Sequence, residues 1–110
     1  MPSRLLRRVF GPSAASTTAA TVYTNTTGQT TKITELIITQ PGTGLVKNVI
    51  LSIGTDATGT RAIIFPVPAG AGTWILNPGI VLTGTEIIQL SASTDTGVAN
   101  VTANGIVEAA

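Results

Sequence analysis

The sequence predicts an all-β protein, an antiparallel β-sandwich or jelly roll of seven to eight short strands preceded by an extended basic N-terminal arm. Thr, Val and Ile are abundant, and these β-branched side chains favour the pleated surface of a sheet. Clusters of Gly, Pro, Asn and Asp interrupt the chain at short intervals, as turns do. The intervals between strands contain no helical pattern of about 10–15 residues, which excludes a parallel βαβ architecture.

Residues 1–18 are expected to form the arm, and residues 19–110 the sandwich domain. The apolar residues between positions 5 and 10 have the i, i+3/i+4 spacing of one or two helical turns, which Gly11-Pro12 would end. This apolar group is too small to fold alone, so we interpret it as an anchor that fills a groove on a partner. The expected anchor residues are Arg4, Leu5, Leu6, Arg7, Arg8, Val9 and Phe10.

The strands are assigned from β-branched and apolar runs between turns, including a turn at Asn77-Pro78-Gly79. Period-2 alternation supports several of them, because successive side chains of a strand point to opposite faces. In 31–39 it places Leu36 and Ile38 on one face, and Ile33 with Ile37 on the other. The expected strands span residues 20–25, 31–39, 45–53, 61–67, 73–76, 80–82, 86–93 and 98–107.

The 110 residues include six Lys and Arg, five Asp and Glu, and neither His nor Cys. This composition excludes disulfides, zinc fingers, haem ligation and thiol or imidazole catalysis. Residues 1–34 carry four positive charges, whereas residues 35–110 carry two positive and five negative charges, a net of −3. Three arginines in the arm are too few to hold nucleic acid firmly, so no nucleic-acid partner is expected. No secretion signal is expected, because only Val9 and Phe10 lie between the arginines and Gly11-Pro12. No apolar run of about 18 residues occurs, so no membrane partner is expected.

No catalytic residues, metal site or cofactor are expected, and the protein is predicted not to be an enzyme. Asp56 and Asp95 fall in expected turns, where Asp stabilises the backbone, and Glu35 and Glu86 fall in strands far apart in the sequence. The glycosylation pattern at residues 25–27 is interpreted as coincidental. Two aromatic residues, Tyr23 and Trp74, are candidate interface residues, with a sugar-binding surface as the open alternative.

Several segments carry a resemblance to a known family: TVYTNTTGQTTKITELIITQ (Thr21–Gln40), LSIGTDATGTR (Leu51–Arg61), PVPAG (Pro66–Gly70), TEIIQLSAS (Thr85–Ser93) and VTANGIVE (Val101–Glu108), preceded by LLRRVFGPS. Together they resemble small virion proteins of tailed bacteriophages over nearly the whole chain. The sequence departs from that pattern at residues 25–28, where Asn-Thr-Thr-Gly replaces Val-Pro-Ala-Gly. The resemblance implies a capsid decoration (cement) protein or a head or tail accessory protein, without enzymatic activity.

On this basis the expected function is binding to the outer surface of the phage head, where the protein bridges major capsid subunits and its arm serves as anchor. The expected location is the virion, after synthesis in the host cytoplasm. The partners are the major capsid protein and other copies of the chain, with a homotrimer as one arrangement left open. Two alternatives also remain open: a tail or head-fibre protein that binds the host surface, and a pilin-like fibre subunit whose arm adds a strand to its neighbour.

Overall fold

The computed structural model of the protein describes residues 6–42, 47–93 and 99–109. All regular secondary structure in these ranges is β-strand, in two antiparallel sheets, which confirms the predicted fold class. The strands are β1 (Arg7–Ala15), β2 (Ala20–Thr24), β3 (Gln29–Gln40), β4 (Lys47–Ile53), β5 (Arg61–Val67), β6 (Gly72–Leu76), β7 (Ile80–Leu82), β8 (Ile87–Ala92) and β9 (Ala99–Ala109).

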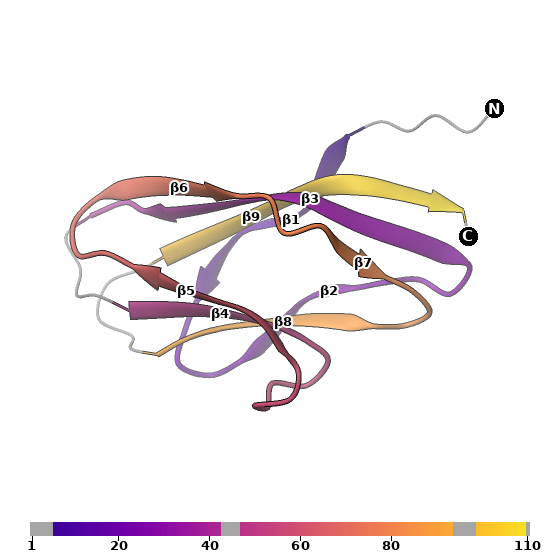
Figure 1. Ribbon diagram of the computed structural model, residues 1–110, viewed down its shortest axis with the longest axis horizontal. Coiled ribbons are helices and arrows are strands. Elements are labelled where there is room, and N and C mark those ends of the chain that lie inside the picture. Colours follow the sequence, from indigo (N-terminus) through magenta and orange to yellow (C-terminus); the bar gives the residue numbers. More distant parts are fainter. Residues whose placement is uncertain (1–5, 43–46, 94–98, 110) are drawn as a thin grey trace.

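The two sheets lie one above the other in Figure 1. Sheet A has the order β1-β9-β3-β6, with β7 also paired to β3, and sheet B has the order β2-β8-β4-β5. The antiparallel pairs are nested: β4 with β5, β3 with β6 and β7, β2 with β8, and β1 with β9. Pairing of β3 with β9 and of β4 with β8 completes the sheets. Nested pairs rolled into two layers, here of five and four strands, define a jelly roll, so the topology resolves the choice between the two predicted sandwich types.

Each predicted strand has a counterpart, although residues 45–46 and 98 lie outside the described residues. The expected turn at Asn77-Pro78-Gly79 does not reverse the chain. β6 pairs with Leu36–Gln40, and β7 pairs with Thr31–Ile33 of the same strand in the same direction. Since Pro78 has no N–H to donate to the ladder, the segment interrupts one edge strand and leaves two short ones.

The predicted faces of β3 are corrected by a bulge. The register of β3 with β9 shifts between Ile33 and Glu35. One extra residue in a strand reverses which face the preceding side chains occupy. As a result Ile33 is fully buried on the face shared by Leu36 and Ile38, whereas Ile37 lies on the opposite face and is half-buried.

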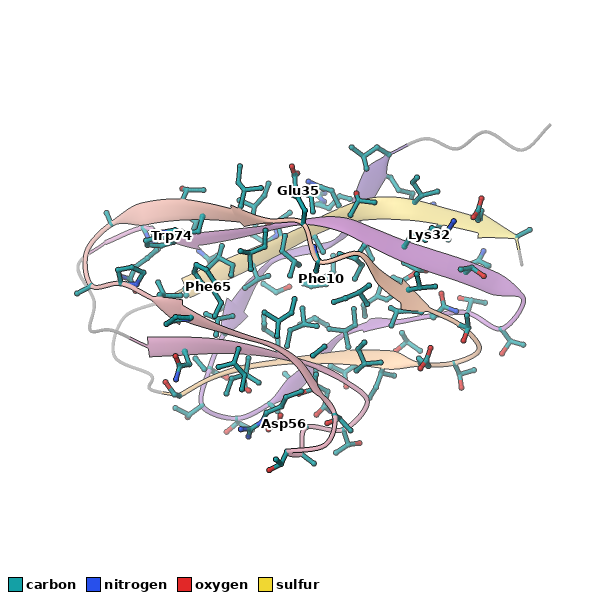
Figure 2. All side chains as sticks on the ribbon, in the orientation of Figure 1. Phe10, Lys32, Glu35, Asp56, Phe65 and Trp74 are labelled. Carbon is teal, nitrogen blue, oxygen red and sulfur yellow. The ribbon has the colours of Figure 1, made fainter. Side chains whose placement is uncertain are left out.

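The core lies between the sheets and consists of aliphatic side chains around one aromatic ring, that of Phe10 (Figure 2). Its largest members are fully buried, and at about 1.5–3 kcal/mol per side chain they supply most of the stabilisation. The largest fully buried aliphatic residues are Ile33, Leu36, Ile38, Leu51, Val67, Leu82, Ile88, Leu90 and Val101.

Candidate functional site

The N-terminal segment differs from the predicted arm, because residues 7–15 form strand β1 of the sandwich. β1 pairs with β9 from Arg7 opposite Gly105 to Ala15 opposite Ala99. Phe10 is 6% exposed and points between the sheets (Figure 2). The predicted helical turns are therefore replaced by a strand, and the sandwich begins before residue 19. The physical reason is the burial of Phe10, because the transfer of its apolar ring from water into the core has a favourable free energy.

Only part of the predicted anchor is available to a partner in this structure. Leu6 is 63% exposed, and Arg7 and Arg8 are exposed on β1. Val9 is half-buried against the core, and Phe10 belongs to the core itself. The remaining two predicted anchor residues, Arg4 and Leu5, lie outside the described residues. The accessible surface is thus a small basic patch with one apolar side chain, which we call the N-terminal patch (Leu6, Arg7 and Arg8).

The two candidate interface aromatics lie at opposite lateral edges of the sandwich. Tyr23 is on β2, the edge strand of sheet B that lies next to β1, and its hydroxyl group is 2.8 Å from Thr31 Oγ1. Trp74 is on β6 at the other edge, where its ring centroid lies 6.2 Å from that of Phe65 on β5 (Figure 2). Both are half-buried. Because the structure separates them, they do not line one shared sugar site.

A buried polar network holds the turn that follows Tyr23. Asn25 is 1% exposed, and its Nδ2 donates to the carbonyl oxygens of Gln29 and Gly84, each at 2.9 Å. Its Oδ1 accepts a hydrogen bond of 2.6 Å from the hydroxyl of Thr31. The network joins the β2–β3 turn to the β7–β8 loop, so Asn25, at the point where the sequence departs from the resembled pattern, has a structural role. Its burial also agrees with the interpretation of the glycosylation pattern as coincidental.

The described carboxylates are dispersed and engaged in local interactions. Glu35 Oε1 accepts from Asn104 Nδ2 at 2.9 Å, and Glu86 Oε1 accepts from the backbone N–H of Thr83 at 2.7 Å. Glu108 Oε1 lies 3.3 Å from Lys32 Nζ. Among the described residues, no group of three or more Asp or Glu side chains is placed to hold a metal ion.

Asp56 belongs to a hydrogen-bonded network below sheet B (Figure 2). Its carboxylate accepts from Arg61 Nε at 3.0 Å and from Ser52 Oγ at 2.7 Å, and its backbone N–H donates to Gln89 Oε1 at 2.9 Å. The hydrogen bonds from Arg61 and then Ser52 lower the pKa of Asp56 below its ordinary value of 3.8. The network attaches the β4–β5 loop to β8, so the role of Asp56 is structural.

The most apolar exposed surface is the lateral edge formed by β5, β6 and β7, which we call the β5–β7 edge. β5 ends sheet B and β6 ends sheet A on the same side of the sandwich (Figure 1). Four large apolar side chains are exposed among the described residues, and three of them lie here, one per strand: Ile64 (54%), Ile75 (59%) and Val81 (51%). Sequence reasoning missed this surface. The sequence feature that accompanies this surface is the absence of any charged residue from Ala62 to Thr85.

Comparison with known proteins adds no functional assignment. No protein-family model matches the chain, and no curated protein sequence matches it. Among solved structures, a chain from the structure of infectious bursal disease virus Gx strain aligns over 96% of this chain with 13% sequence identity and a TM-score of 0.48. This chain covers 31% of that viral chain. In the described part of the protein, no helix is long and apolar enough to cross a membrane.

Proposed function

We propose that this protein is a capsid decoration protein of a tailed bacteriophage, a non-enzymatic virion component that binds the outside of the head and bridges neighbouring major capsid subunits. The proposal rests on the resemblance to small phage virion proteins that was drawn from the quoted segments, which no family model and no curated sequence repeats. A compact jelly roll without a gathered set of carboxylates in its described residues suits a structural module better than a catalyst.

The proposed head contact is made by the N-terminal patch. Arg7 and Arg8 are exposed at the free edge of sheet A, where they are available to form charge-assisted hydrogen bonds with capsid carboxylates. Leu6 is 63% exposed beside them and adds apolar area to the same contact. Since β1 is fixed in the sheet, these side chains are held by a rigid body, which reduces the entropy lost on binding.

A protein that bridges neighbouring capsid subunits stabilises the shell. A rigid body that contacts two neighbouring capsid subunits adds buried area across their joint, so the joint opens only if that area is exposed again. Two contacts on one body also raise the effective concentration of the second contact once the first has formed. Individually weak contacts thereby give lasting occupancy on the assembled head, whereas a single isolated capsid subunit binds poorly.

The test uses heads of the phage that encodes the chain, assembled without the protein and then incubated with it. We expect the protein to bind these heads and to raise the temperature at which they release DNA. The variant R7S/R8S removes two positive charges and should bind at least about tenfold more weakly. The matched control is A57D/T58D, which changes the net charge by the same amount on two exposed residues of the β4–β5 loop and should bind like the unmodified protein.

Three results would overturn parts of the proposal. Absence of the protein from purified virions would refute the virion role altogether. Antibody labelling at the tail instead of the head would favour the tail-accessory alternative. Equal binding of R7S/R8S and A57D/T58D would exclude the N-terminal patch as the head contact. We do not propose the pilin-like alternative, because β1 fills the edge of sheet A beside β9 that a donor strand would occupy.

A further inference from the structure

The two lateral edges of the sandwich are built differently. At one edge, β1 and β2 both have irregular registers with their partners, and β1 carries two exposed arginines. The backbone N–H of Ala92 also donates to the carbonyl of Ser16 at 2.7 Å, which fastens the connection between the two strands. Bulges and charges are the usual means by which proteins prevent an edge strand from pairing with another chain. This edge is therefore protected.

The β5–β7 edge carries fewer of those protections. The β4–β5 register shifts only next to Arg61, Pro66 lies in β5, and the segment at Pro78 separates β6 from β7. β6 keeps an unbroken register with β3, from Leu76 opposite Leu36 to Gly72 opposite Gln40. The sequence from Ala62 to Thr85 contains no charged residue. β6 is therefore a regular, uncharged edge strand, and each of the three strands carries an exposed aliphatic side chain on its outer face. These features suit a surface to association.

The side chains just inside this edge are also incompletely covered. Except for the fully buried Val67, the large side chains of β5 and β6 that face the core remain half-buried, because neither sheet has a further strand on this side to cover them. The loop between the two strands is held in place, since Gln40 Nε2 donates to the carbonyl oxygens of Pro68 at 2.9 Å and Gly70 at 2.6 Å. A surface fixed in this way loses little entropy when a partner covers it. The half-buried inward-facing residues are Ile63, Phe65, Trp74 and Leu76.

We propose that the β5–β7 edge is the contact surface for a second copy of this chain, and that the two copies are related by a twofold axis. An uncharged surface meets its own copy without burying charge and without like-charge repulsion. Because the opposite edge is protected against pairing, the edge of a second copy that is available to the β5–β7 edge is the same β5–β7 edge. Self-complementary contacts of this kind are isologous and close as dimers, whereas a trimer needs two different surfaces.

The dimensions are sufficient for a stable dimer. Residues 72–82, which include β6 and β7, span roughly 35 Å at about 3.3 Å per residue. Two sheets about 10 Å apart, with the side chains on either side, make an edge roughly 20 Å wide. The product is roughly 700 Å², close to the roughly 800 Å² that each partner contributes to a standard interface.

In the proposed dimer, the backbone of β6 pairs with β6 of the second copy across the twofold axis, whereas β5 contributes side-chain contacts. Pro66 removes one N–H from β5 and thereby interrupts any ladder there. β6 contains no proline, and antiparallel pairing with its own copy would extend sheet A across the dimer. The dimer is independent of the capsid role, so either proposal can fail while the other holds.

The experiment measures molar mass by light scattering and sedimentation across the micromolar range. The unmodified chain should approach twice its mass of 11.1 kDa. Ile75→Lys and Ile64→Lys should each raise the dissociation constant of the dimer by at least about 100-fold, because each places two ammonium groups in an apolar contact. Leu6→Lys is the matched control, since it makes the same kind of change at a 63% exposed residue away from this edge. It should remain dimeric.

The single tryptophan supplies a second readout. Trp74 lies at the proposed contact, so its fluorescence should shift to longer wavelength and become more accessible to iodide when the dimer dissociates on dilution. Far-UV circular dichroism of the lysine variants checks that they remain folded. A monomeric unmodified chain, a trimer, or a lysine variant at Ile64 or Ile75 that dimerises as tightly as Leu6→Lys would each overturn the proposal.

Discussion

Replacing Phe10 with Ala is expected to destabilise the protein strongly, although this residue lies near the start of the chain. Phe10 is 6% exposed and packs in the core between the sheets. Removal of a buried phenyl ring costs about 3–5 kcal/mol, from lost transfer free energy and the cavity that remains. Small proteins are stable by only about 5–15 kcal/mol. At about 4 °C per kcal/mol for this size, the melting temperature should fall by roughly 12–20 °C.

The assay is urea denaturation, followed by the fluorescence of Trp74 and by far-UV circular dichroism. It is run at one protein concentration, because dimerisation would make the apparent free energy of unfolding depend on concentration. Arg8→Ala is the control, since Arg8 is exposed on the same strand and its loss should change stability by less than about 0.5 kcal/mol. If Phe10→Ala were as stable as Arg8→Ala, β1 would not be part of the folded core, and the interpretation of residues 7–15 as a free arm would return.

Three further predictions concern the strand contacts and the two polar networks. A Cβ at Gly105 would collide with a backbone carbonyl of β3, so Gly105→Ala should cost at least about 2 kcal/mol of unfolding free energy. The control Gly59→Ala, which has open space, should cost less than about 0.5 kcal/mol, and equal melting temperatures for the two would contradict the close approach. Asn25→Ala leaves buried hydrogen-bonding groups without partners and should lose about 2–4 kcal/mol in urea denaturation; a loss below about 0.5 kcal/mol would refute the role of the network. Because the pKa of folded Asp56 is lowered, chiefly by the hydrogen bond from Arg61, its stabilisation is present above pH 3.8 and is lost as the pH falls through the lower folded value. The melting temperature of the unmodified protein should thus exceed that of Asp56→Asn at neutral pH and approach it at strongly acidic pH, whereas a constant difference would contradict this assignment.

Local sequence patterns predicted most of the fold because most strands here alternate regularly. In β8 and β9, apolar and polar residues alternate, and this pattern alone places Leu90 and Val101 in the core. β1 was missed because RRVFGPSAA contains Gly11-Pro12 and small residues, which favour an irregular segment. Its strand is held by pairing with β9, a contact between opposite ends of the chain that no local pattern contains.

Prediction of the candidate surfaces was limited for a similar reason. The exposure of Arg7 and Arg8 agrees with the idea of a basic contact, but the burial of Phe10 depends on which strands lie next to β1. The β5–β7 edge could not be read from charge alone. A charge-free stretch of similar length, Val9–Thr31, includes β2 and most of β1 and carries no large exposed apolar residue. Both stretches contain strands that end the sheets, but the registers of β1 and β2 shift, whereas that of β6 is unbroken.

The sequence by itself determined the class of the fold, the positions of eight strands and the scarcity of reactive groups. These properties follow from composition, from β-branched residues and from the period of two, each of which acts over a few residues. Tertiary structure decided the jelly-roll topology, the incorporation of residues 7–15 and the reversal of Ile33 by the bulge in β3. It also decided which apolar side chains stay exposed at a sheet edge. These features depend on pairing between distant segments, where the burial gained by one arrangement exceeds local preference.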